Sequence, residues 1–258
     1  MSAVGSFISS FEFMVLRAKF KRGMEYELRD VVSTLMHDMV SNIVQMKESD
    51  NDSDVDYSRR ASQAISTAFD ADSLSALADF IPSIQSLVPD AVKKENVGCS
   101  NWQLVLLLSK LLCSVLGQER KIFIALDDLQ WADPTTLELV KDVLISICQC
   151  PEERQRLVFV GMHRDNKVSS HLTSFTKSFG VAGGVVADVT HVKLSTLSLD
   201  DVIEMIMTEM RLPRRLVSEL ADVVHKRTHG HAPFVVQLLN SLVSDLTISY
   251  SPLLHQFY

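Results

Sequence analysis

Residues 121–134, with the sequence KIFIALDDLQWADP, decide the fold class of this chain. The first part of the stretch is apolar and of strand length, and it ends in the acidic pair Asp127-Asp128. Asp133 and Pro134 then provide an N-cap and a proline at the first helical position, which is the usual start of a helix. In a parallel sheet the last residues of each strand reach the edge where ligands bind, so the acidic pair is a candidate site. The alternative is a strand that simply ends in a polar turn.

Segments on both sides of this stretch extend the same pattern. Strands are predicted at Gly5–Phe13, Leu157–Met162 and Val189–Leu194, and helices at residues 15–46, Ala61–Leu77, Trp102–Leu116 and after Pro134. The acidic segment Lys47–Arg60 has no periodicity and is predicted to be a solvated loop. Apolar strands that alternate with helices indicate an α/β fold, with a parallel sheet covered by helices on both faces.

From Ser198 onward the pattern is helical. Ser198 with Asp201 predicts a capped helix, and two more helices are predicted at Pro213–Arg227 and Pro233–Leu246, with Gly230 between them. The chain is therefore predicted to divide into a sheet-containing core over residues 1–197 and a small helical lid over residues 198–246. The last residues, 247–258, are predicted to form a hairpin or the start of a following domain.

Composition excludes several classes of protein. The chain has 258 residues and a net charge of −7, which argues against a general nucleic-acid binder because such a protein needs a basic surface. Its four cysteines show no paired spacing, which favours a reducing compartment over a disulfide framework. No export signal or membrane span is evident in the sequence. These features together predict a cytoplasmic protein.

The run Leu126–Pro134, LDDLQWADP, closely resembles the signature of a family of predicted ATPases. These are AAA-type, STAND-like ATPases of signal transduction, also described as origin-recognition-complex-like. Three further blocks resemble the same family in the same order. They are residues 158–164 (VFVGMHR), residues 194–201 (LSTLSLDD) and residues 228–234 (THGHAPF). The resemblance implies an incomplete P-loop NTPase core followed by a helical lid.

The resemblance also implies roles for individual residues. Asp127 would bind Mg²⁺, Asp128 would orient the water that attacks the γ-phosphate of ATP, and Arg164 would act as a sensor that reaches this phosphate. Gly230 and Pro233 would set the lid against the nucleotide, although Ala232 stands where the family has proline and Pro233 is shifted by one position. ATP and Mg²⁺ are thus the implied ligands. Family members are fused to kinases, cyclases or transcription regulators, which implies a signalling effector as the partner.

The phosphate-binding loop of such an ATPase, G-x-x-x-x-G-K-[ST], is not found in the chain: none of its nine glycines precedes Lys-Ser or Lys-Thr. The resemblance implies that the chain starts just after this loop, so weak ATP binding is expected. Two functions from different classes follow. One is a regulatory ATPase that uses binding and hydrolysis as a conformational switch, and the other is a non-catalytic protein-interaction module derived from such an ATPase.

Three weaker patterns have simpler explanations. His225, His229 and His231 have a spacing that metal sites use, but no acid or cysteine completes the set. The aspartates of residues 50–56 lack the glycine and glutamate of a calcium loop and are better explained as a solvated segment. Ser62 matches a short consensus for basophilic kinases, and such matches are mostly accidental.

Overall fold

The protein is described by a computed structural model that covers residues 13–22, 28–89, 99–118, 120–150, 155–179, 187–244, 250–251 and 256–257. It divides into two compact units, residues Met1–Val189 and Thr190–Tyr258, and each has its own hydrophobic core. Within the described ranges, no helix has the length and apolar character that crossing a bilayer would require.

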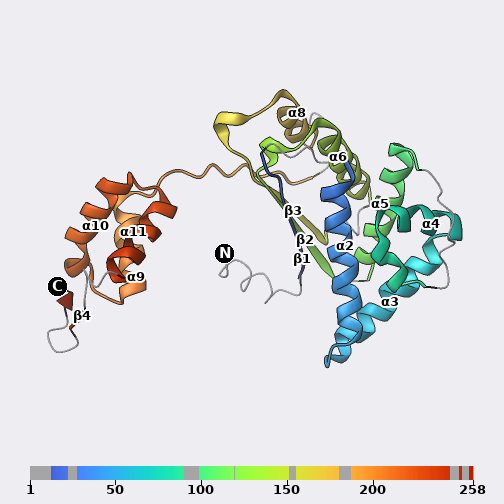
Figure 1. Ribbon diagram of the computed structural model, residues 1–258, viewed down its shortest axis with the longest axis horizontal. Helices are drawn as coiled ribbons and strands as arrows, with labels where there is room; N and C mark the ends of the chain where they lie inside the picture. The colour runs from blue at the N-terminus through green and yellow to red at the C-terminus, as the bar shows by residue number, and fades with distance from the viewer. Residues whose placement is uncertain are drawn as a thin grey trace. The chain divides into compact units, whose positions relative to one another are not determined.

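The first unit contains a three-stranded parallel sheet with helices packed on one side of it (Figure 1). Its strands are β1 (Phe13–Lys19), β2 (Lys121–Asp127) and β3 (Leu157–Gly161), in the order β1-β2-β3. Lys19 pairs with Asp127, and Leu126 pairs with Gly161, so all three strands end at the same edge. A parallel sheet combined with helices confirms the α/β fold class.

Three long helices cover one face of this sheet. They are α2 (Leu28–Lys47), α5 (Asn101–Leu116) and α6 (Pro134–Cys148), and Figure 1 shows α2 running alongside the strands. Apolar residues of all three helices enclose a cavity of about 30 Å³ together with Ile124, Leu126 and Phe159 of the sheet. On the opposite face Val158 is 40% exposed, and Val15, Phe123 and Val160 are half-buried. The prediction that helices cover both faces is therefore wrong for the described part of the chain.

The start of the chain differs from the prediction. Residues 5–12 of the predicted first strand lie outside the described residues, and Phe13 begins β1. Residues 15–19 were predicted to be helical, yet they continue this strand, and α2 begins at Leu28. Met14 and Leu16 are buried and alternate with Val15 and the exposed Arg17, and this period of two is that of a strand.

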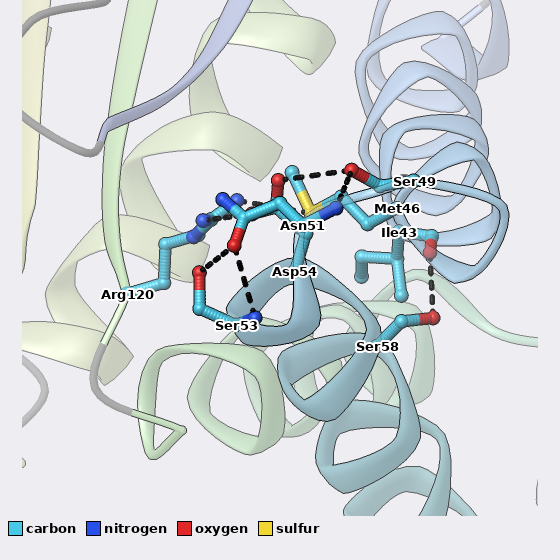
Figure 2. A network of polar contacts seen from close by, with 8 residues as sticks. All are labelled: Ile43, Met46, Ser49, Asn51, Ser53, Asp54, Ser58 and Arg120. Carbon is cyan, nitrogen blue, oxygen red and sulfur yellow. Dashed lines mark hydrogen bonds and ion pairs between the residues drawn. The ribbon is translucent and has the colours of Figure 1, made fainter.

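Helix α3 (Asp52–Ala68) occupies most of the segment that was predicted to be a solvated loop. Asn51 is its N-cap, because the Asn51 side chain accepts a hydrogen bond from the Ser53 amide at 3.1 Å (Figure 2). Asp52 and Asp54 lie in the first turn, where negative charge is stabilised by the helix dipole. The acidic residues that suggested a loop are therefore part of a helix start, and Ser62 lies inside a helix rather than at the edge of a loop.

An ion pair fixes the corner between α2 and α3. Arg120, just before β2, contacts Asp54 at 2.6 Å, and its guanidinium lies over the ring of Tyr57 at 4.8 Å (Figure 2 shows the ion pair). The same guanidinium lies 3.0 Å from the sulfur of Met46. Ser58 donates a hydrogen bond to the Ile43 carbonyl at 2.7 Å and so joins the two helices directly.

The remaining helices of the first unit are short. Asp70 caps α4 (Ala71–Phe80), so the predicted helix Ala61–Leu77 is in fact two helices with a break at Phe69 and Asp70. A 3₁₀ turn, η1 (Pro82–Ser86), follows α4. After β3 come η3 (Asp165–Lys167) and α8 (Ser170–Ser178), which lie in a segment that was predicted to be a polar loop.

The second unit contains a group of three helices, as predicted: α9 (Leu199–Met210), α10 (Arg214–Thr228) and α11 (Ala232–Ser244). Ser198 and Asp201 form the predicted capping box of α9. The core of the unit consists of residues such as Val202, Ile206, Val217, Ala221, Val224 and Val235. The short strands β4 (Tyr250–Ser251) and β5 (Gln256–Phe257) pair antiparallel near the C-terminus.

One predicted strand does not form. Residues Val189–Leu194 have no regular structure, and Val192 and Leu194 are 76% and 89% exposed. Their sequence favours a strand, but a strand is stable only when its backbone groups pair with a neighbour. No described strand pairs with this segment, so the prediction is wrong.

Candidate functional site

Two carboxylates lie at the edge where the strands of the first unit end. Asp127 is the last residue of β2, and Asp128 follows it with φ 57° and ψ 40°, in the left-handed region. This conformation is unfavourable for most residues but tolerated by aspartate, and it is frequently found at functional sites. The Asp127 side chain accepts the Asp128 amide hydrogen at 2.8 Å and so helps to hold the turn.

The turn after Asp128 connects the site to the neighbouring strand. It forms the 3₁₀ helix η2 (Leu129–Trp131), whose Leu129 amide donates to the Met162 carbonyl at 2.9 Å. Gln130 donates its side-chain amide to Asp128 at 2.7 Å and accepts the Arg164 backbone amide at 3.1 Å. Gln130 thus positions both the second carboxylate and the residue that follows β3.

Three of the predicted site residues therefore lie together. Arg164 is 65% exposed, and its Nε atom lies 3.8 Å from Oδ1 of Asp128. Asp127 is 39% exposed and Asp128 16%, so both carboxylates are accessible from solvent. The aspartates lie at the edge where parallel strands end, as the sequence pattern predicted, and Arg164 lies beside Asp128, as the family resemblance implied.

A fourth residue, Lys19, was missed by the sequence analysis. Its ammonium lies 2.7 Å from Oδ2 of Asp127 and 2.9 Å from Oδ2 of Asp128. The signal that could have found it is the alternation of apolar and charged residues from Leu16 to Phe20, which places Lys19 at the end of a strand parallel to β2.

These contacts shift the pKa values of Asp128 and Lys19. The hydrogen bond from Lys19 and, next in importance, the one from Gln130 hold the pKa of Asp128 below its usual range. The same contacts with Asp127 and Asp128 raise the pKa of Lys19. Asp128 is therefore a carboxylate and Lys19 an ammonium ion at neutral pH.

Basic side chains lie over the aromatic ring of Trp131, at the rim of the site. Trp131 lies below the guanidinium of Arg22 at 5.6 Å and the ammonium of Lys167 at 4.6 Å from its ring centroid. Asp133, at the end of the turn, accepts the Thr136 amide hydrogen at 2.8 Å and caps α6 as predicted. Asp133 thus has a structural role as the N-cap of α6, and this role explains the acidic residue at position 133.

The donor set is compatible with Mg²⁺. This ion prefers oxygen ligands and is typically held by one or two carboxylates with water and substrate phosphates completing the shell. Two of the four carboxylate oxygens face Gln130, Arg164 and the Asp128 amide, and the other two face Lys19. The described residues contain no group of three or more histidine, cysteine, aspartate or glutamate side chains that could hold a metal.

Gly230 and Pro233 belong to the second unit, and their contacts are described within that unit. Gly230 has φ +70° and lies against Leu197, whose amide donates to the Gly230 carbonyl at 2.8 Å. A Cβ atom on Gly230 would lie 2.2 Å from the Leu197 carbonyl oxygen, which is a direct packing reason for glycine. Pro233 is exposed in the first turn of α11.

The histidine pattern has a structural explanation in the same place. The ring of His225 lies 3.2 Å from the Leu197 carbonyl oxygen through its Nε2 atom, and His229 adopts a left-handed conformation that ends α10. His231 contacts the ring of Phe234 edge-on. In the described part of the chain, neither these histidines nor the aspartates of residues 50–56 belong to a metal-binding group.

Comparison with protein-family models, with curated proteins and with solved structures finds no match to this chain.

Proposed function

We propose that the chain contributes the metal and water-activating edge of a cytoplasmic regulatory ATPase domain. The supporting observation is that Asp127, Asp128 and Arg164 converge at the carboxyl edge of a parallel sheet. The proposal also rests on the resemblance of residues 126–134 to the signature of STAND-like AAA ATPases. It includes Mg²⁺ and ATP as ligands and an attached or associated signalling effector as the partner.

The roles of the side chains follow from their positions. Mg²⁺, when bound, would neutralise charge on the phosphates. Asp127 would hold the ion, because its carboxylate ends the strand and is more exposed than that of Asp128. Asp128 would orient or deprotonate the attacking water, and its lowered pKa keeps it ionised at neutral pH. Arg164 would donate to the phosphate oxygen on which charge develops.

The test adds a phosphate-binding loop to the chain. A strand–loop–helix segment with G-x-x-x-x-G-K-S is joined ahead of residue 13, and ATP hydrolysis is measured as phosphate release. We expect Asp128→Asn to lower kcat by about 100-fold or more with nearly unchanged nucleotide affinity, the usual scale for a positioned base. Asp127→Asn is expected to weaken Mg-ATP binding instead. Equal hydrolysis by the Asp128→Asn protein would contradict the proposed role of the second acid.

The second candidate function is a non-catalytic interaction module. One observation favours it: the sheet face opposite α2, α5 and α6 carries the apolar residues Val158, Phe123 and Val160 and is partly exposed. Such a face is typical of a surface that a partner covers. Absence of hydrolysis in the joined protein, despite measurable Mg-ATP binding, would favour this module over the ATPase.

A further inference from the structure

The carboxylate pair shares one protein cation. Lys19 approaches Asp127 and Asp128 from the neighbouring strand and contacts the Oδ2 atom of each, at 2.7 and 2.9 Å. One positive charge between two carboxylates is the arrangement in which a metal ion would bridge them. A divalent cation that bridges the same two oxygens would therefore be repelled by the ammonium at close range.

The backbone holds Lys19 in this place. Lys19 pairs in register with Asp127, and the next amide, that of Phe20, donates to the Asp127 carbonyl at 3.0 Å. Phe20 itself is buried, with 1% of its surface exposed, and anchors the end of the strand. The root of the Lys19 side chain is thus fixed beside the pair.

The ammonium group of Lys19, in contrast, can move away from the two carboxylates. The Lys19 side chain is 58% exposed and has a flexible four-carbon stem. Ion pairs at such exposed positions are weak, because water and salt screen them. Asp128 keeps its contacts with Gln130 and Arg164 when the ammonium moves away, so the carboxylates stay in position.

We propose that the Lys19 ammonium is the resident counter-ion of Asp127 and Asp128, and that a divalent cation binds this pair only by displacing it. Lys19 is then a residue that sets the affinity of the site for metal. The proposal rests on the metal site of the proposed function, but it concerns binding of the ion and not hydrolysis.

The experiment is a titration of the full chain with Mn²⁺ alone, followed by electron paramagnetic resonance of the free ion. Lys19→Met removes the charge and keeps most of the stem. We expect it to bind Mn²⁺ about tenfold more tightly, since a neighbouring unit charge changes the proton affinity of a carboxylate by about one to three orders of magnitude and solvent screening at this exposed position keeps the effect near the lower end. Lys19→Arg keeps the charge and is expected to retain the wild-type affinity.

Two control variants test whether the change in Mn²⁺ affinity arises at Asp127 and Asp128. Lys141 also contacts two acids, Glu138 at 3.1 Å and Asp142 at 3.4 Å, but on α6, so Lys141→Met is expected to leave Mn²⁺ affinity unchanged. Adding Asp127→Asn to Lys19→Met is expected to abolish the gain. If Lys19→Met does not fold, as judged by circular dichroism, Lys19→Gln replaces it as the neutral variant.

Equal Mn²⁺ affinity of the neutral variant and the wild type overturns the proposal, as does a gain that persists with Asn at position 127. Absence of Mn²⁺ binding in both proteins overturns it as well. Because the titration contains no nucleotide, its outcome is independent of whether the joined protein hydrolyses ATP.

Discussion

Replacing Gly230 by alanine tests whether this glycine serves the packing of the second unit. Its φ of +70° is disfavoured for alanine by about 1–2 kcal/mol. The new Cβ would lie 2.2 Å from the Leu197 carbonyl oxygen, so the backbone must shift and weaken the 2.8 Å hydrogen bond from the Leu197 amide, which contributes about 1 kcal/mol. We therefore expect the second unit to lose about 2–4 kcal/mol of stability.

Hydrogen exchange measured by mass spectrometry reports on the amides of each helix separately, so it shows where this stability is lost. Amides of α9, α10 and α11 are expected to exchange roughly 30- to 1,000-fold faster in Gly230→Ala, because 1.36 kcal/mol corresponds to a factor of ten. Amides of α5 and α6 in the first unit are expected to be unaffected. Gly117→Ala is the matched control: Gly117 also follows a helix, but its φ is −60°. Unchanged exchange in α9–α11 would refute the packing role and leave a nucleotide contact as the reason for glycine.

Three more perturbations follow from the first unit. Arg120→Met removes the ion pair with Asp54 and the contact with Tyr57, and we expect a loss of about 1–3 kcal/mol in urea unfolding; an unchanged midpoint would contradict this. Burial raises the pKa of Tyr57 to about 12, so absorbance titration is expected to show that Tyr57 ionises late, and stability that is complete below pH 10 is lost as pH rises through 12. Asp133→Ala removes the N-cap of α6 and is expected to cost about 1 kcal/mol by thermal unfolding, whereas Asp133→Asn keeps the cap and is expected to cost less.

Local signals explain what could be predicted from sequence. The strand before Asp127 and the helix after Asp133 lie within a residue or two of their predicted bounds, because an apolar run and a capping residue act over a few positions. The proximity of Arg164 to Asp128 was implied by the family resemblance, and Arg164 lies in the loop after β3 at the same edge of the sheet.

Features that depend on distant partners were harder to predict. Helix α3 has a polar sequence, and its acids are stabilised by the helix start and, for Asp54, by Arg120, which lies 66 residues away. Val189–Leu194 has the composition of a strand but no described pairing neighbour. Lys19 was assigned to a helix because the apolar residues that follow at helical spacing obscured the shorter alternation from Leu16 to Phe20.

At position 128 the left-handed backbone conformation and the required side-chain charge favour different residues. Glycine and asparagine adopt φ 57° more easily than other residues, so either would relieve the backbone, yet neither carries a carboxylate. The candidate chemistry, in contrast, requires the negative charge that Lys19, Gln130 and Arg164 contact. A library of variants selected for thermal stability alone would therefore drift toward glycine or asparagine at residue 128. One selected for activity would retain aspartate and accept a less stable turn.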